Sequence, residues 1–142
     1  MTRVDFAFNA DARVAQAARS TLRHVARGAR LFVYCDDPDR LKAFDLALWS
    51  AQDTTFVPHE MLQDDIDDLP VYLVDQASWP LVAARATDTD WLVNLDDDCP
   101  PEAMLFKRVL EIVSQEDADR ELARTRWRQY QAMGADLHAH QL

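Results

Sequence analysis

Apolar residues in this chain gather in short runs, separated by longer segments with helical spacing. The segments 4–8 and 108–113 alternate between apolar and polar residues, whereas 29–35, 71–74 and 91–95 are apolar almost throughout. Alternation is typical of a half-covered strand, and a continuous apolar run is typical of a parallel strand covered on both faces. The pattern therefore predicts roughly five strands in a mostly parallel sheet.

Segments with helical spacing follow the first two strands, which is the order typical of an α/β layer fold. The expected helices cover residues 12–27, 36–49, 100–106 and 116–133. Gly28 and Gly134 stand where they would end the first and the last of these helices, and Pro38 stands near the start of the second. No repeat, low-complexity tract or linker interrupts the chain, so residues 1–142 are expected to form one domain.

The composition excludes several function classes. The chain carries 25 Asp and Glu against 15 Lys and Arg, a net charge of -10, and wrapping nucleic acid directly needs a net positive face. It contains two glycines, which removes the Gly-rich phosphate loop and the dinucleotide-binding motif from consideration. The two cysteines have no metal-ligand spacing, and no cofactor is expected.

Two observations indicate the compartment. No apolar run approaches the ~20 residues that a membrane-spanning helix needs. The residues after Met1 lack the apolar core of a signal peptide. The expected localisation is therefore cytoplasmic, without a membrane partner.

Three adjacent carboxylates, Asp96-Asp97-Asp98, are the strongest sign of an enzyme. They follow an expected strand, at the position where α/β folds place ligand groups, and could hold Mg²⁺ or Mn²⁺. The competing interpretation is a solvated loop before a helix that begins at Pro100-Pro101. No basic residue follows within several positions to hold a nucleotide's phosphates. A divalent-metal-dependent enzyme stays as an alternative to a binding protein.

The histidines form no pattern typical of a metal site. His24 is expected on the surface of the first helix. His138 and His140 are expected in a frayed, polar C-terminal tail.

The C-terminal helix carries many cations for so acidic a protein: the arginines at positions 120, 124, 126 and 128 surround Trp127. At 3.6 residues per turn, Arg120, Arg124 and Trp127 fall along one helix face, which Arg128 borders. Pairing with acidic residues one turn away is one interpretation, although Arg126 and Arg128 have no acidic neighbour at helical spacing. Direct binding of single-stranded DNA is another. The better match is a peptide whose terminal carboxylate is held by arginine and whose apolar side chain lies beside Trp127.

Trp49 and the extended segment 56–59 allow two interpretations. Trp49 ends a helix that already has Leu41, Phe44 and Leu48 to bury, so periodicity favours a core position for Trp49 and Phe56. If they are exposed, they would form an apolar patch for a protein partner.

Several motifs, spread over most of the chain, are shared with one protein family. They are Thr2-Arg3-Val4-Asp5-Phe6, Ala47-Leu48-Trp49, Thr55-Phe56-Val57-Pro58-His59, Leu92-Val93-Asn94-Leu95, Glu111-Ile112-Val113-Ser114 and Ala123-Arg124-Thr125-Arg126-Trp127-Arg128-Gln129-Tyr130. The chain resembles the chi subunit of bacterial DNA polymerase III, part of the clamp-loader assembly. The resemblance implies a three-layer α/β/α, Rossmann-like fold without a nucleotide loop. It also implies a non-catalytic subunit, because the polymerase activity belongs to the holoenzyme.

The resemblance further implies two binding surfaces. The acidic C-terminal tail of single-strand DNA-binding protein would be bound by Val113, Arg120, Arg124, Trp127 and Arg128. The psi subunit, which tethers chi to the clamp loader, would be bound by Trp49, Phe56, Val57 and Pro58. A repair helicase can use the psi surface in related proteins, and DNA would be contacted only indirectly. This favours exposure of Trp49, and it gives Asp96-Asp97-Asp98 no inherited role.

Overall fold

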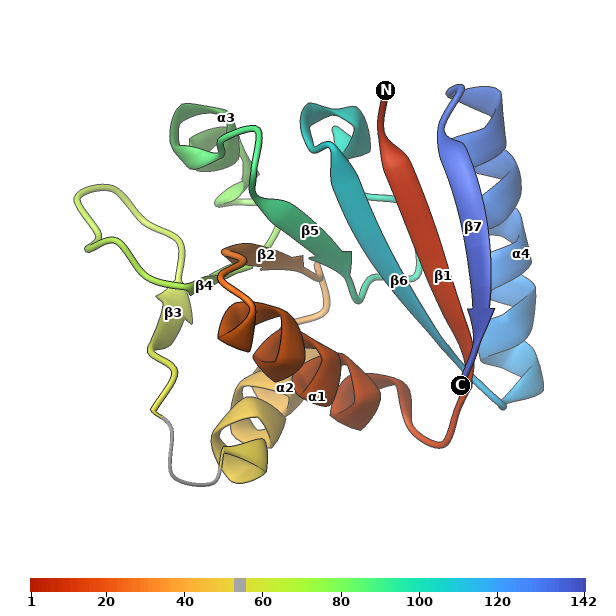
Figure 1. The fold of residues 1–142 in the computed structure, drawn as a ribbon, viewed down its shortest axis with the longest axis horizontal. Coiled ribbons are helices and arrows are strands. Elements are labelled where there is room, and N and C mark those ends of the chain that lie inside the picture. Colours follow the sequence, from red (N-terminus) through yellow and green to blue (C-terminus); the bar gives the residue numbers. More distant parts are fainter. Residues whose placement is uncertain (53–55) are drawn as a thin grey trace.

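The chain folds into three layers, with helices on both faces of a parallel sheet (Figure 1). The computed structural model describes residues 1–52 and 56–142, so Thr55 of the shared motif lies outside the described residues. The described strands are β1 (Arg3–Ala10), β2 (Leu31–Tyr34), β3 (His59–Met61), β4 (Val71–Val74), β5 (Trp91–Asn94), β6 (Arg108–Ser114) and β7 (Asp136–Gln141). They are all parallel, in the order β3-β4-β2-β5-β6-β1-β7.

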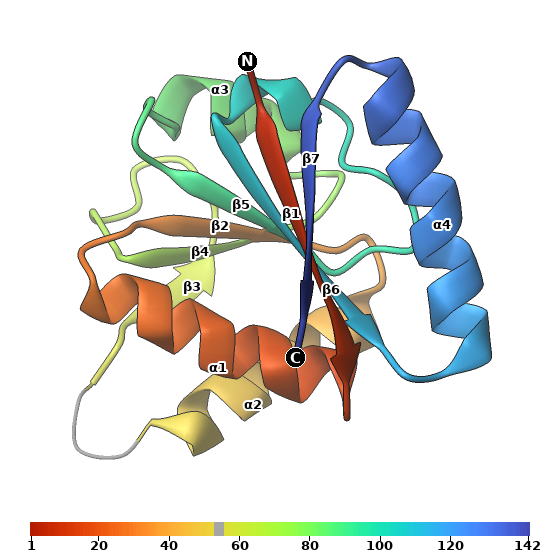
Figure 2. The same cartoon turned by 45° about the vertical axis from the view of Figure 1, so that its right-hand side comes forward.

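The helices cover the two faces of the sheet separately. The described helices are α1 (Arg13–Ala26), α2 (Pro38–Ala51), α3 (Val82–Arg85) and α4 (Asp117–Ala132), with single 3₁₀ turns at Trp79–Leu81 and Ala103–Leu105. In Figure 2, α1 and α2 lie together below one face, and α4 runs along the other. Two separate apolar clusters correspond to these faces. One contains Phe44 and Ile112 under α1 and α2, and the other contains Phe6 and Tyr130 under α4.

The expected ends of the helices α1, α2 and α4 are confirmed, whereas the helix expected at 100–106 is wrong, because only the 3₁₀ turn Ala103–Leu105 forms there. Pro38 is the first residue of α2, and the side chain of Asp37 caps the helix by accepting hydrogen bonds from the amides of Asp39 at 3.0 Å and Arg40 at 3.4 Å. Gly28 and Gly134 follow α1 and α4 with φ of 93° and 83°, the left-handed conformation that glycine adopts without strain.

The α/β class and the five expected strands are confirmed, and two further strands complete the sheet. The extended segment 56–59 runs into β3 at one edge, with His59 as the first strand residue, and β7 forms the other edge. The expectation of a frayed tail at His138 and His140 is wrong, because these residues lie in β7 opposite Asp5 and Ala7 of β1. Backbone pairing orders this polar segment, and backbone groups leave no hydrophobic pattern in a sequence.

The expected surface position of His24 is also wrong. Its ring is half-buried, with its centroid 4.4 Å from that of Trp91. Burial, followed by the positive charge of Arg23, lowers the pKa of His24 to about 4. None of the described helices is long and apolar enough to cross a membrane.

Candidate functional site

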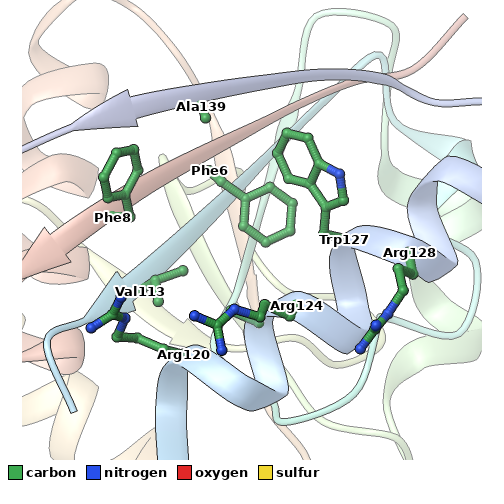
Figure 3. A pocket seen from close by; sticks show the side chains of 9 residues that line it. Phe6, Phe8, Val113, Arg120, Arg124, Trp127, Arg128 and Ala139 are labelled. Carbon is green, nitrogen blue, oxygen red and sulfur yellow. The ribbon is translucent and has the colours of Figure 1, made fainter. Parts of the chain in front are cut away.

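A groove of about 390 Å³ runs between α4 and the face of the sheet formed by β6, β1 and β7. It is lined by Phe6, Phe8, Val113, Arg120, Ala123, Arg124, Trp127, Arg128 and Ala139. Figure 3 shows arginine side chains along the helix wall and phenylalanine rings opposite them. The groove therefore combines an apolar floor with a cationic wall.

The floor follows from the alternation of β1. Residues two apart in a strand share a face, so Phe6 and Phe8 both point toward α4. The ring of Phe6 lies 5.1 Å from that of Trp127 and 5.8 Å from that of Tyr130, measured between centroids. Phe6 is thereby buried, while Phe8, farther along β1, remains partly exposed. Phe8 therefore presents an accessible apolar surface at one end of the groove.

The wall follows from the helical spacing of α4. Arg120, Arg124 and Arg128 are each one turn apart and line the same groove. The side chain of Arg120 is 52% exposed with one Nη 4.0 Å from Asp117, and Arg124, 56% exposed, pairs with Glu121. Exposed pairs of this kind contribute on the order of 0–1 kcal/mol. A carboxylate ligand can therefore compete for these arginines.

The sequence-predicted tail residues Val113, Arg120, Arg124, Trp127 and Arg128 all line this groove. Sequence reasoning missed four lining residues, Phe6, Phe8, Ala123 and Ala139. The alternation of the first strand could have placed Phe6 and Phe8 on one face. Ala139 could not have been found, because the tail that holds it was not recognised as a strand.

Arg126 has a different role from its neighbours. It is fully buried on the inner side of α4, where its Nε donates to Glu111 Oε1 at 3.1 Å and one Nη donates to the carbonyl of Asp97 at 3.0 Å. Arg126 has no acidic neighbour at helical spacing, and its acidic partner Glu111 comes from β6 rather than from the same helix. Arg126 thus anchors α4 and leaves the groove to the other three arginines.

Glu111 lies at the centre of a buried polar network. Its Oε2 accepts hydrogen bonds from Tyr130 Oη and from Asn94 Nδ2, each at 2.7 Å, and Arg13 lies 3.7 Å from Oε1. Burial, together with the adjacent charge of Glu111, raises the pKa of Tyr130 well above its ordinary value. The network joins β5, β6 and α4, and so holds the helix at a fixed position against the sheet.

Two of the three aspartates after β5, Asp96 and Asp97, contact other elements of the protein. Asp96 Oδ1 accepts a hydrogen bond from the amide of Asp36 at 3.1 Å, and Asp97 Oδ1 accepts one from Arg40 at 3.0 Å. Arg13 donates to the carbonyl of Asp96 at 2.9 Å. Within residues 1–52 and 56–142, no group of three His, Cys, Asp or Glu side chains could hold a metal ion. The sequence near the aspartates has no basic residue, but the fold brings Arg13 of α1 and Arg40 of α2 to them.

The second predicted surface lies at the end of α2. Trp49 is 41% exposed and Phe56 is 67% exposed, with ring centroids 5.3 Å apart. The core position that periodicity favours for these two residues is therefore wrong. Pro58 is half-buried, whereas Val57 packs in the core at 5% exposure. The ring of His59 packs against that of Trp49, with the two centroids 4.3 Å apart.

Comparison with known proteins gives consistent matches over most of the chain. The family model described as "DNA polymerase III chi subunit, HolC" matches residues 1–138. A Pseudomonas aeruginosa protein named DNA polymerase III subunit chi is 32% identical over 146 residues, covering 100% of this chain and 98% of that protein. The protein of the same name from Escherichia coli is 29% identical over 112 residues, covering 78% of this chain and 73% of its own length.

Proposed function

Because the chain belongs to the DNA polymerase III chi subunit family, we propose that it is a non-catalytic adaptor in DNA replication. Its groove binds the acidic C-terminal tail of single-strand DNA-binding protein, and its Trp49–Phe56 surface binds the psi subunit of the clamp loader. The protein thereby connects the clamp loader to the protein that coats the single-stranded template. A repair helicase is a further candidate for the psi surface.

The observation that carries the tail assignment is the combination of three exposed arginines with an aromatic floor in one groove. Arginine binds carboxylates through paired, charge-assisted hydrogen bonds, worth on the order of 1.5–3 kcal/mol. The rings of Phe8 and Trp127 offer an apolar side chain a surface on which to pack. A peptide with a terminal carboxylate, acidic side chains and an apolar last residue matches both features.

The psi assignment is supported by the exposed aromatic pair at the end of α2. Trp49 and Phe56 form an apolar patch of the kind that marks protein interfaces, and Trp is enriched among the residues that dominate binding energy. Val57 is buried beneath this surface, so its proposed contribution is to support the patch rather than to contact the partner.

Substitution of Arg124 tests the tail assignment. We expect Arg124→Ala to weaken binding of an acidic peptide that ends in an apolar residue with a free carboxylate by about tenfold, since a lost charge-assisted hydrogen bond costs on the order of 1.5 kcal/mol. Isothermal titration calorimetry with the purified protein measures this change. Binding should also weaken as salt is added, because the attraction is between charges.

The matched control is Arg23→Ala, which removes an exposed arginine from α1 on the other side of the sheet. Its affinity for the peptide should equal that of the wild type. Equal losses in the two variants would point to net charge rather than to the groove. Unchanged affinity in Arg124→Ala, or preferential binding of a single-stranded oligonucleotide, would contradict the proposed function.

A further inference from the structure

The outer edge of β7 is open. The strand is the last of the sheet, pairs with β1 on one side, and among the described residues has no strand on its other side (Figure 1). It contributes six residues, Asp136–Gln141, of which all but Leu137 and His138 are exposed. An open edge with unpaired backbone groups is a template for another extended chain.

The backbone bonds at the two ends of β7 fix which groups face outward. The amide of Asp136 donates to the carbonyl of Thr2, and that of Leu142 donates to the carbonyl of Phe8, both at 2.9 Å. Successive residues of a strand turn their backbone groups to opposite sides. The even-numbered residues therefore pair with β1, and the amides and carbonyls of Leu137, Ala139 and Gln141 point away from the sheet.

This open edge borders the groove. Ala139 lines the groove with its side chain, while its backbone groups lie on the free edge of the same strand. In Figure 3, the strand that carries Ala139 runs above the groove, facing the arginines of α4. A peptide whose end occupies the groove can thus continue along β7 without crossing another element of the described structure.

We propose that the bound acidic peptide adds to the sheet as an eighth strand along β7. This inference rests on the proposed function and specifies how the peptide upstream of its terminal carboxylate is held. Alternate side chains of such a strand point toward the α4 side, where Arg120, Arg124 and Arg128 supply complementary charge. A second copy of this chain is the weaker occupant, because it would bring its whole net charge of -10 to the edge, whereas a short peptide brings only the few charges that the groove arginines can pair.

The test compares two peptides that share the same C-terminal residues. One has four residues and reaches only the groove, and the other has ten residues and also reaches β7. Proline is tolerated in an edge strand where the amide faces outward, so Gln141→Pro removes an outward donor while keeping the bonds to β1. We expect the variant to bind the ten-residue peptide about three- to tenfold more weakly, the effect of one net hydrogen bond. Gln141 does not line the groove, so the variant's affinity for the four-residue peptide should be unchanged.

Gln141→Ser is the matched control, since it replaces the same side chain but keeps the amide. It should bind both peptides as the wild type does, and urea denaturation should give the three proteins similar midpoints. Failure of the wild type to bind either peptide would overturn the proposed function itself. Binding of both peptides with no effect of Gln141→Pro would overturn only the added strand.

A second measurement does not depend on the folding of the proline variant. Single N-methyl groups placed along the ten-residue peptide each block one backbone donor. A paired strand predicts weakened binding at every second position, because only alternate amides face β7. Equal losses at neighbouring upstream positions, or none, would contradict the added strand.

Discussion

At the scale of single residues, arginines that are neighbours in sequence have opposite environments. Arg126 is fully buried against Glu111, whereas Arg124, two positions earlier, is 56% exposed and lines the groove. A helix turns by about 100° per residue, so two positions suffice to move a side chain from one face to the other. Arg126 therefore fixes the helix, and Arg124 is available to a ligand.

This difference predicts different costs of substitution. Arg126→Met should lower the free energy of unfolding by roughly 3–5 kcal/mol, because it leaves the buried charge of Glu111 without its closest cation. Arg128→Met, on the exposed side of the same helix, should change it by no more than about 0.5 kcal/mol. Urea denaturation of both variants measures the difference, and equal stabilities would contradict the structural role of Arg126.

The sequence did contain an indication that Arg126 points inward, although the search for charged neighbours along the helix did not use it. Glu111 stands in an apolar strand between Leu110 and Ile112, where a lone carboxylate needs a buried partner. Arg126 lies on the stripe of α4 that also holds Ala123 and Tyr130, both buried. The partner of Glu111 still could not be identified from spacing, because β6 and α4 meet only through the fold.

At the scale of elements, predictability followed burial. The central strands β2, β4 and β5 are apolar runs covered on both faces, and all three were predicted close to their observed bounds. The edge strand β7 reads Asp-Leu-His-Ala-His-Gln and is largely exposed, so its composition resembles a tail. What orders β7 is pairing with β1, a long-range interaction that leaves no local pattern.

The alternating environment of β7 can be measured directly. We expect the amides of His138 and His140, which face β1, to exchange with solvent more slowly than those of Leu137 and Ala139, which face outward. Hydrogen exchange followed by NMR resolves these four amides. Uniformly slow exchange would mean that the outer edge is covered, and uniformly fast exchange would mean that the strand is frayed in solution.

At the scale of the whole molecule, the two proposed binding surfaces are carried by helices on opposite faces of the sheet. The groove involves α4, and the Trp49–Phe56 surface lies at the end of α2 (Figure 2). A protein with a net charge of -10 also repels an acidic peptide at long range. Discrimination for the tail must then come from contacts within the groove, inside the ~8 Å screening length at physiological ionic strength.

Separation of the surfaces predicts independent loss of partners. Trp49→Ala should weaken binding of purified psi subunit by about 30-fold, the scale of an interface residue that contributes 2 kcal/mol, and should leave peptide affinity in the groove unchanged. Leu105→Ala, which removes a comparably exposed apolar side chain elsewhere, is the control. Surface plasmon resonance with both ligands measures the two affinities. Retention of psi by Trp49→Ala would contradict the assignment of this surface.

The buried ion pair between Arg126 and Glu111 also restricts where residues can be inserted into or deleted from the chain. One residue inserted between Arg124 and Arg126 would rotate the upstream part of the helix by about 100° relative to the anchored Arg126. Arg120 and Arg124 would then leave the groove together, even though no groove residue had been replaced. Insertions and deletions among relatives should therefore collect in loops such as 63–69 and be absent from the part of α4 between 120 and 128.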